Sequence, residues 1–200
     1  MDMKKLDALL ILLLLMPIGF KSMCQDVVDS ARVLRVMTFN IYHGETMNGD
    51  FDLDLIAGVI RQEDPDLVAL QEVDFRTKRA RNMDLVSELG TRTGLVALFG
   101  RAMPFDGGEY GEGILSKYSF LSSRNHALPA GEGKEPRAAL EVRVVLPGGD
   151  TIAFVGTHFD HTGEVDRIEQ ATRVREILEG IDQPVLLAGD LNARPGSRTM

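Results

Sequence analysis

Four groups of polar residues each follow a strongly apolar run in this 200-residue sequence. The groups are Thr38-Phe39-Asn40 after 33–37, Gln71-Glu72 after 67–70, Thr157-His158 after 152–155, and Gly189-Asp190-Leu191-Asn192 after 185–188. Polar side chains at strand ends build sites, because the strand is rigid and the loop that follows is open to a ligand. Carboxylate and carboxamide oxygens are hard ligands that suit Mg²⁺, and the only cysteine, Cys24, lies far from all four groups in the sequence.

Each of these groups also has an ordinary structural explanation. Glu72 could be a solvated strand end, Asn40 a turn residue, and His158 a hydrogen-bonded histidine at the rim of a core. Taken one at a time, the structural explanation is the better one. The joint occurrence of four such strand ends is what favours a functional site.

The elements that would position these groups alternate between strands and helices. Short β-branched runs predict strands at 33–40, 67–70 and 95–100, and apolar residues at helical spacing predict helices over 53–60 and 83–93, the second closed by Gly94. The glycine-rich stretch 101–113 predicts a loop. Consecutive strands follow at 114–116, 120–128, 138–146 and 151–157, then a helix over 167–178 and a buried strand at 185–188. Consecutive strands between strand-helix units favour a mixed α/β layered fold over a doubly wound parallel sheet.

The composition is that of one globular domain. Hydrophobic residues make up 44% of the chain and charged residues 26%, and the formal net charge is -8. An acidic chain is not expected to hold nucleic acid through a broad basic face, although a local basic cleft is compatible with this charge.

The first 24 residues differ from the rest. Lys4 and Lys5 precede an apolar stretch over 8–20, and small residues around Cys24 follow, which is the pattern of a secretory signal peptide. We therefore expect export, periplasmic or extracellular, with the folded domain over 25–200. Cleavage after Cys24 is the simpler interpretation, and a lipid anchor on Cys24 is the alternative.

Five segments together resemble the endonuclease/exonuclease/phosphatase superfamily, the DNase I-like metal-dependent phosphoesterases, in its exported bacterial branch. They are Met37-Thr38-Phe39-Asn40-Ile41, the 65–73 segment around Gln71-Glu72, Gly113-Ile114-Leu115-Ser116-Lys117, Gly156-Thr157-His158-Phe159-Asp160 and Gly189-Asp190-Leu191-Asn192. The resemblance covers about 32–196 with the order preserved. It implies a four-layer αββα sandwich and hydrolysis of phosphodiesters or phosphomonoesters by in-line attack of water, with Mg²⁺, Mn²⁺ or Ca²⁺ as the metal.

The resemblance also implies a role for each matching residue. Glu72 matches the principal metal ligand, and Asn40 a residue beside the metal. Asp190 matches the group that orients and deprotonates the attacking water, and Asn192 a donor to the phosphate oxygens. His158 matches a histidine that hydrogen-bonds the scissile phosphate or helps to protonate the leaving group.

Three further positions match less closely. Tyr110 lies where relatives carry a phosphate-contacting tyrosine, and Arg137 resembles a recurrent arginine of the exported branch, with a surface ion pair as its structural explanation. The basic segment Arg76-Thr77-Lys78-Arg79-Ala80-Arg81 could hold a substrate phosphate, with Arg76 as the first candidate, or could be a solvated loop. His43 also resembles that branch, although a loop histidine is the better explanation.

One family feature is missing from the sequence. Family members carry a late Ser-Asp-His-like motif, and no histidine follows His161 here. The expectation is therefore that the domain is truncated at its C-terminus, lacks the family's last strands, and has weak or no activity.

Two alternatives stay open at this point. An exported non-catalytic protein on the same fold could bind an anionic ligand. The segment Thr157-His158-Phe159-Asp160-His161 also resembles part of the metal motif of metallo-β-lactamase-like zinc hydrolases, although no later histidine completes a zinc shell. The sequence does not distinguish nucleic acid, phospholipid head group and inositol phosphate as substrates, nor does it indicate an oligomeric state.

Overall fold

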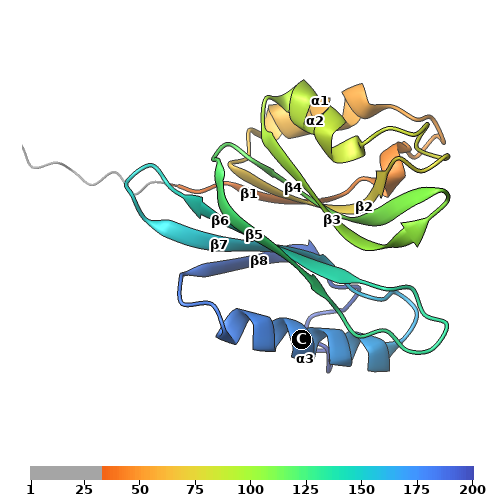
Figure 1. Ribbon diagram of the computed structural model, residues 1–200, viewed down its shortest axis with the longest axis vertical. Helices are drawn as coiled ribbons and strands as arrows, with labels where there is room; N and C mark the ends of the chain where they lie inside the picture. The colour runs from red at the N-terminus through yellow and green to blue at the C-terminus, as the bar shows by residue number, and fades with distance from the viewer. Residues whose placement is uncertain (1–32) are drawn as a thin grey trace, which may run out of the picture. The chain divides into compact units, whose positions relative to one another are not determined.

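Two four-stranded sheets lie face to face between two layers of helices in the computed structural model, which describes residues 33–200 (Figure 1). The predicted signal peptide, 1–24, and Cys24 lie outside the described residues. The four-layer αββα sandwich expected from the sequence is confirmed. No helix in the described range is long and apolar enough to span a bilayer.

The first sheet has the order β1-β2-β4-β3. β1 pairs parallel with β2, and β4 pairs antiparallel with both β2 and β3. Two helices cover the outer face of this sheet (Figure 1). The elements of this half are β1 (Val36–Asn40), the 3-10 helix η1 (Tyr42–Gly44), α1 (Leu53–Glu63), β2 (Leu67–Phe75), α2 (Leu85–Thr93), β3 (Val96–Phe105) and β4 (Gly108–Ser116).

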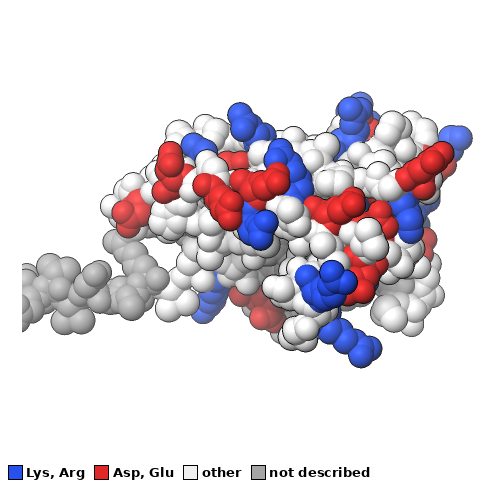
Figure 2. Space-filling model, turned by 90° about the horizontal axis from the view of Figure 1, so that it is seen from below, with Lys and Arg blue, Asp and Glu red and all other residues white. Residues whose placement is uncertain are grey.

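The second sheet has the order β5-β6-β7-β8, and one helix covers its outer face. β6 pairs antiparallel with β5 and β7, and β8 pairs parallel with β7. Seen from the α3 side, acidic and basic side chains are interspersed (Figure 2). The elements of this half are β5 (Phe120–Ala127), β6 (Ala138–Val145), β7 (Thr151–His158), α3 (Glu164–Glu179) and β8 (Val185–Asp190).

Local sequence signals explain where the first two helices begin and end. The Asp52 side chain accepts from the backbone N–H groups of Asp54 and Leu55 and thereby caps α1, and Asp84 caps α2 in the same way. Gly94 ends α2 in the left-handed conformation (φ +73°), which confirms it as the predicted stop.

The core has three parts, and the middle one joins the two sheets. Alternate residues of the central strands point into the space between the sheets and are fully or almost fully buried there. The members of this inter-sheet core are Leu67, Ala69, Ile114, Leu140, Val142, Val144, Ile152 and Phe154. The other residues of the same strands pack against α1 and α2 on one side and against α3 on the other.

The prediction of a loop over 101–113 was wrong. This stretch forms most of a hairpin, in which β3 and β4 turn at Asp106-Gly107. Its glycines are needed for close strand approach, because a Cβ on Gly111 would lie 2.0 Å from the carbonyl oxygen of Gly100. The glycines therefore mark a tightly paired, bulged hairpin rather than an open loop.

Candidate active site at the polar end of the sandwich

The space between the sheets changes from apolar to polar along the strands. The carboxyl ends of β1, β2, β7 and β8 meet at one end of the sandwich, together with the amino ends of β4 and β6. A cavity of about 450 Å³ opens there. Its lining includes Tyr42, His43, Glu72, Arg79, Met103, Phe105, Tyr110, Glu135, Arg137, His158, His161, Asp190 and Asn192. Most of the residues singled out in the sequence therefore share one cavity.

Glu72 and Asn40 form the half of the site that belongs to the first sheet. Asn40 Nδ2 donates to Glu72 Oε1 over 2.8 Å, and Asn40 Oδ1 accepts from the backbone N–H of Tyr42 over 3.0 Å. Glu72 lies where the β2–β4 register shifts, with a left-handed φ of +56°. That strained backbone turns the carboxylate out of the strand's alternation and into the cavity.

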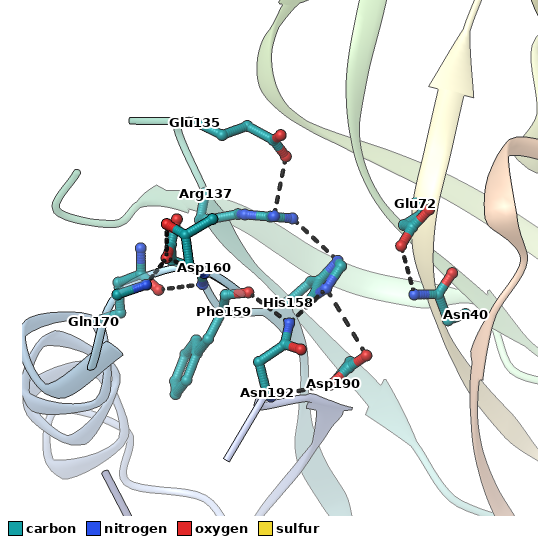
Figure 3. A network of polar contacts seen from close by, with 12 residues as sticks. Asn40, Glu72, Glu135, Arg137, His158, Phe159, Asp160, Gln170, Asp190 and Asn192 are labelled. Atoms are coloured by element: carbon teal, nitrogen blue, oxygen red, sulfur yellow. Dashed lines mark hydrogen bonds and ion pairs between the residues drawn. The ribbon is translucent and has the colours of Figure 1, made fainter. Parts of the chain in front are cut away.

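His158, Asp190 and Asn192 form the opposite half, at the end of β7, at the end of β8 and just after β8 (Figure 3). Asn192 Nδ2 lies 3.0 Å from His158 Nε2 and 3.0 Å from the carbonyl oxygen of Phe159. Asp190 Oδ1 accepts from the backbone N–H of Asn192 over 3.0 Å, and Asp190 Oδ2 lies 3.8 Å from His158 Nε2. Asn192, like Glu72, has a left-handed φ (+46°), which holds its amide against the imidazole.

Arg137 enters this half of the site from the start of β6. Only 3% of it is exposed, its Nη1 lies 3.1 Å from His158 Nδ1, and its Nη2 pairs with Glu135 over 3.0 Å. The alternative explanation of Arg137, a surface ion pair, is therefore wrong. Its guanidinium is buried against the imidazole of His158.

The electrostatics of the cavity keep His158 neutral. Burial lowers the pKa of His158 from 6.5 to about 4, and the nearby charge of Arg137 acts in the same direction. Asp190 and Glu72 oppose the shift without reversing it. At neutral pH the imidazole is thus an uncharged hydrogen-bonding group rather than a cation.

Two further ionisable groups lie under the cavity on β4. Burial raises the pKa of the Tyr110 phenol, so that it stays protonated and can donate a hydrogen bond. Burial also raises the pKa of Glu112 well above its ordinary value, and neither carboxyl oxygen of Glu112 has a hydrogen-bond partner within 33–200. Tyr110, predicted to lie in a loop, is a strand residue.

The basic segment divides into one cavity residue and two that stack elsewhere. Arg79 forms two hydrogen bonds with the buried Asp74 and lies 4.4 Å from the centre of the Phe105 ring, in the cavity wall. Arg76 and Arg81 lie over the rings of Phe75 and Phe51 instead, and neither lines the cavity. A role for Arg76 in holding substrate stays a prediction.

Sequence reasoning missed Glu112, Glu135 and Tyr42 as parts of this neighbourhood. Glu112 shares the side of β4 that Tyr110 and Ile114 face, so the spacing of two along a strand was the signal that could have found it. Glu135 lies in a loop and Tyr42 begins the three-residue 3-10 helix η1, and neither segment is long enough for a periodicity that shows which way a side chain points.

The donor set fits a magnesium ion. Asn40 provides the one hydrogen bond to the Glu72 carboxylate among the described residues, and it uses only Oε1, so Oε2 is available at the cavity. Mg²⁺ keeps several waters and is commonly held by one or two carboxylates, whereas zinc needs a closer shell of nitrogen or sulfur ligands. Within 33–200 no three His, Cys, Asp or Glu side chains are grouped so that they could hold a metal ion together.

Comparisons with a protein family and with solved structures agree with each other. Residues 37–200 match the Endonuclease/Exonuclease/phosphatase family. The crystal structure of an endonuclease/exonuclease/phosphatase from Beutenbergia cavernae is 31% identical to this chain, with a TM-score of 0.66. That match covers 80% of this chain and 47% of the Beutenbergia protein, so the chain spans about half of that protein's length.

Two structures of lower identity share the fold. A mannosyl-6-phosphatase from Bacteroides thetaiotaomicron is 20% identical, with a TM-score of 0.69, and the match covers 84% of this chain and 68% of that one. TDP2 from D. rerio, complexed with a single-strand DNA product, is 22% identical, with a TM-score of 0.62, and the match covers 80% and 61% of the two chains.

Proposed function

Because this chain belongs to the endonuclease/exonuclease/phosphatase family, we propose that it is a Mg²⁺-dependent phosphoesterase that hydrolyses a phosphate ester by in-line attack of water. The proposed site is the cavity between Glu72 on the first sheet and His158, Asp190 and Asn192 on the second. The proposed reaction breaks the bond between phosphorus and the ester oxygen and forms a bond between phosphorus and water oxygen.

One observation carries this proposal. Two groups come from different sheets: Glu72 with its hydrogen-bond partner Asn40, and Asn192 with His158 and Asp190 (Figure 3). Glu72 lines one side of the cavity, and His158, Asp190 and Asn192 line the other. A structural role for each residue alone would not require them to converge. A phosphate group needs such convergence, because its charge has to be met from several directions in the transition state.

Each residue has a distinct role in the proposed reaction. Glu72, oriented by Asn40, would hold the metal, and a bound Mg²⁺ would supply charge neutralisation at the phosphate oxygens. Asp190 accepts the proton that the attacking water loses, while the leaving alcohol oxygen takes a proton from solvent. The side chains of Asn192 and His158 donate hydrogen bonds to the phosphate oxygens and hold the group in line.

The substrate is proposed only at the level of a phosphate monoester or diester. The similar structures include a mannosyl-6-phosphatase and a protein complexed with single-strand DNA product, so the same fold serves substrates of different chemistry. Nucleic acids, phospholipid head groups and inositol phosphates all present the charge that this cavity would bind. Export of the chain stays a prediction from residues 1–24.

A hydrolysis assay with a metal-binding measurement tests the proposal. We expect the chain to bind one divalent cation and to hydrolyse bis-p-nitrophenyl phosphate or p-nitrophenyl phosphate with Mg²⁺, to stop in EDTA, and to recover when Mg²⁺ is restored. Because the sequence predicts weak or no activity, the assay needs high enzyme concentration and long incubation. Glu72→Gln should lower both the binding and the turnover.

Three outcomes would overturn the proposal. Turnover that persists in EDTA would remove the metal from the reaction, and the absence of both metal binding and turnover would remove the site. Binding of metal and inorganic phosphate without any turnover would favour the non-catalytic binding protein on the same fold.

A further inference from the structure

The His158 imidazole has an N–H donor on each side. Arg137 Nη1 lies 3.1 Å from Nδ1, and Asn192 Nδ2 lies 3.0 Å from Nε2. The Asn192 amide is fixed in this orientation because the same nitrogen donates to the carbonyl oxygen of Phe159 over 3.0 Å. Figure 3 shows the arginine and the asparagine reaching the ring from opposite sides.

A histidine cannot accept from both neighbours in either of its usual states. A neutral imidazole has one acceptor nitrogen and one N–H, and an imidazolium has no acceptor at all. The imidazolium would aim both of its N–H groups at other N–H groups, which agrees with the lowered pKa of His158. The ring is therefore neutral, and one of its two neighbours determines which nitrogen keeps the proton.

Arg137 is the stronger of the two donors. A guanidinium has no acceptor atom and retains its charge, and a charge-assisted hydrogen bond is about twice as strong as one between neutral groups. Arg137 is also confined, because only 3% of the residue is exposed and Nη2 forms an ion pair with Glu135 over 3.0 Å. The Asn192 amide is neutral, so the N–H that faces Nε2 is the weaker of the two donors.

We infer that Arg137 holds His158 as the neutral tautomer with its proton on Nε2, on the side of the cavity where Asp190 lies. Asp190 Oδ2 is 3.8 Å from that nitrogen, and the Asn192 N–H that faces it is released for a phosphate oxygen. Arg137 is then a positioning residue that acts through His158. Its meaning for catalysis rests on the proposed function, but the tautomer itself does not.

The tautomer assigns a narrower role to the histidine. With Nδ1 occupied by the guanidinium, His158 can donate from Nε2 but has no charge to give up, so it stabilises a phosphate oxygen rather than acting as a cationic acid. Removing Arg137 would let Nδ1 take the proton and let Nε2 accept from Asn192. The histidine would then be turned into an acceptor toward the cavity.

Nitrogen NMR of the chain labelled with ¹⁵N-histidine tests this directly and needs no turnover. The chain has four histidines, and His158→Asn assigns the signals of this one by their disappearance. We expect His158 Nε2 to carry the proton and Nδ1 to resonate as an unprotonated nitrogen at neutral pH. A protonated Nδ1 in the wild-type chain would overturn the inference, whatever the variants do.

Three variants separate positioning from simple packing. Arg137→Met keeps the length but removes every donor, so we expect the His158 proton to move to Nδ1 in part or completely. Arg137→Lys restores a charged donor and should restore the Nε2–H form. The matched control is Arg143→Met on the same strand, where Arg143 Nε lies 3.3 Å from Glu141 and Arg143 does not line the cavity.

Each of these variants can contradict the inference. An unchanged tautomer in Arg137→Met would show that Asn192 or Asp190, and not the arginine, sets the proton, and would overturn the inference. A tautomer change in Arg143→Met would show that the effect is not specific to Arg137. In an active preparation, Arg137→Met should lower kcat by about tenfold or more while KM changes little.

Discussion

The two ends of the space between the sheets differ in the polarity of the side chains that fill them. At one end, the inward-facing residues of β2, β4, β6 and β7 are all apolar and almost completely buried. At the other end, Glu72 of β2, His158 of β7 and Arg137, which directly precedes β6, line a cavity, and Glu112 of β4 is buried. One pair of sheets therefore carries a close-packed core and a polar site only a few residues apart along each strand.

The polar end contains features that lower the free energy of unfolding. At the polar end, four cavity residues other than glycine have left-handed backbone, namely Tyr42, His43, Glu72 and Asn192. The buried carboxyl group of Glu112 has no hydrogen-bond partner in the described part of the chain. Such features cost free energy and persist only where the surrounding structure holds them. The apolar end has to supply that free energy, since burial of apolar surface is the main favourable term in folding.

The largest expected effect is on activity, at the polar end. Asp190→Asn removes the proposed proton acceptor while keeping the shape of the side chain, so kcat should fall by about 10²–10⁴-fold. The free energy of unfolding should stay near the wild-type value, because the side chain of Asp190 is 40% exposed. Steady-state kinetics and urea unfolding of the same preparation measure both quantities.

The matched control for that substitution is Asp150→Asn in the turn between β6 and β7, which lies at the apolar end. It changes charge by the same amount and should leave kcat unchanged. Equal activity of Asp190→Asn and wild type would remove Asp190 from the reaction.

The next largest effect is on stability, at the apolar end. Leu140→Ala removes a side chain that is 2% exposed in the inter-sheet core, and it should lower the free energy of unfolding by about 2–5 kcal/mol. Chemical denaturation measures this change. If Leu140→Ala lowers the free energy of unfolding no more than Asn192→Ala does, the apolar end does not contribute more to stability than the polar end, contrary to this prediction.

A pH-dependent loss of stability should come from the polar end. The pKa of His158 is about 4 in the folded chain against an ordinary value of 6.5, so the unfolded chain binds more protons between these limits. Stability should therefore fall as pH decreases from 6.5 to 4, by up to about 3 kcal/mol from this residue. His158→Gln should remove that part of the pH dependence, measured by urea unfolding at several pH values. Parallel pH curves for the two chains would contradict a neutral, buried His158.

The smallest effects separate the arginines of the basic segment. Arg79 lies in the cavity wall, and its side chain is 32% exposed, whereas Arg76 lies over Phe75 away from the cavity. Arg79→Ala should raise KM for an anionic ester by about tenfold at most, and Arg76→Ala by less than about twofold. A larger effect for Arg76 would restore it as the substrate-binding residue proposed from sequence.

The order and type of most elements could be predicted from sequence, for identifiable reasons. Alternating and helical spacing marks residues such as Val174 and Ile177 of α3, which do face the core. The hairpin over 101–113 could not be predicted in the same way, because Gly107 and Gly111 are typical of loops when only their sequence neighbours are considered. Their actual role, allowing close strand pairing and a bulge, depends on contacts with distant segments.

The site residues also fall into those that local sequence could predict and those that it could not. Glu72, His158, Asp190 and Asn192 follow apolar runs, so their position at strand ends was visible in the sequence, and the structure brings them to one cavity. The burial of Arg137 was not visible, because a residue before a strand has no periodicity to show which way it points. The spacing of two from Tyr110 indicates which face of β4 carries Glu112, but nothing local shows that its carboxyl group has no hydrogen-bond partner within 33–200.

Titration of the chain with Mn²⁺, followed by electron paramagnetic resonance, tests the central claim most directly, since it asks whether the polar end holds a metal without requiring turnover. We expect the wild-type chain to bind one ion and Glu72→Gln to weaken this binding by about tenfold or more. Equal Mn²⁺ binding by the wild type and Glu72→Gln would contradict it, because the metal would then lie somewhere other than the cavity between the two sheets.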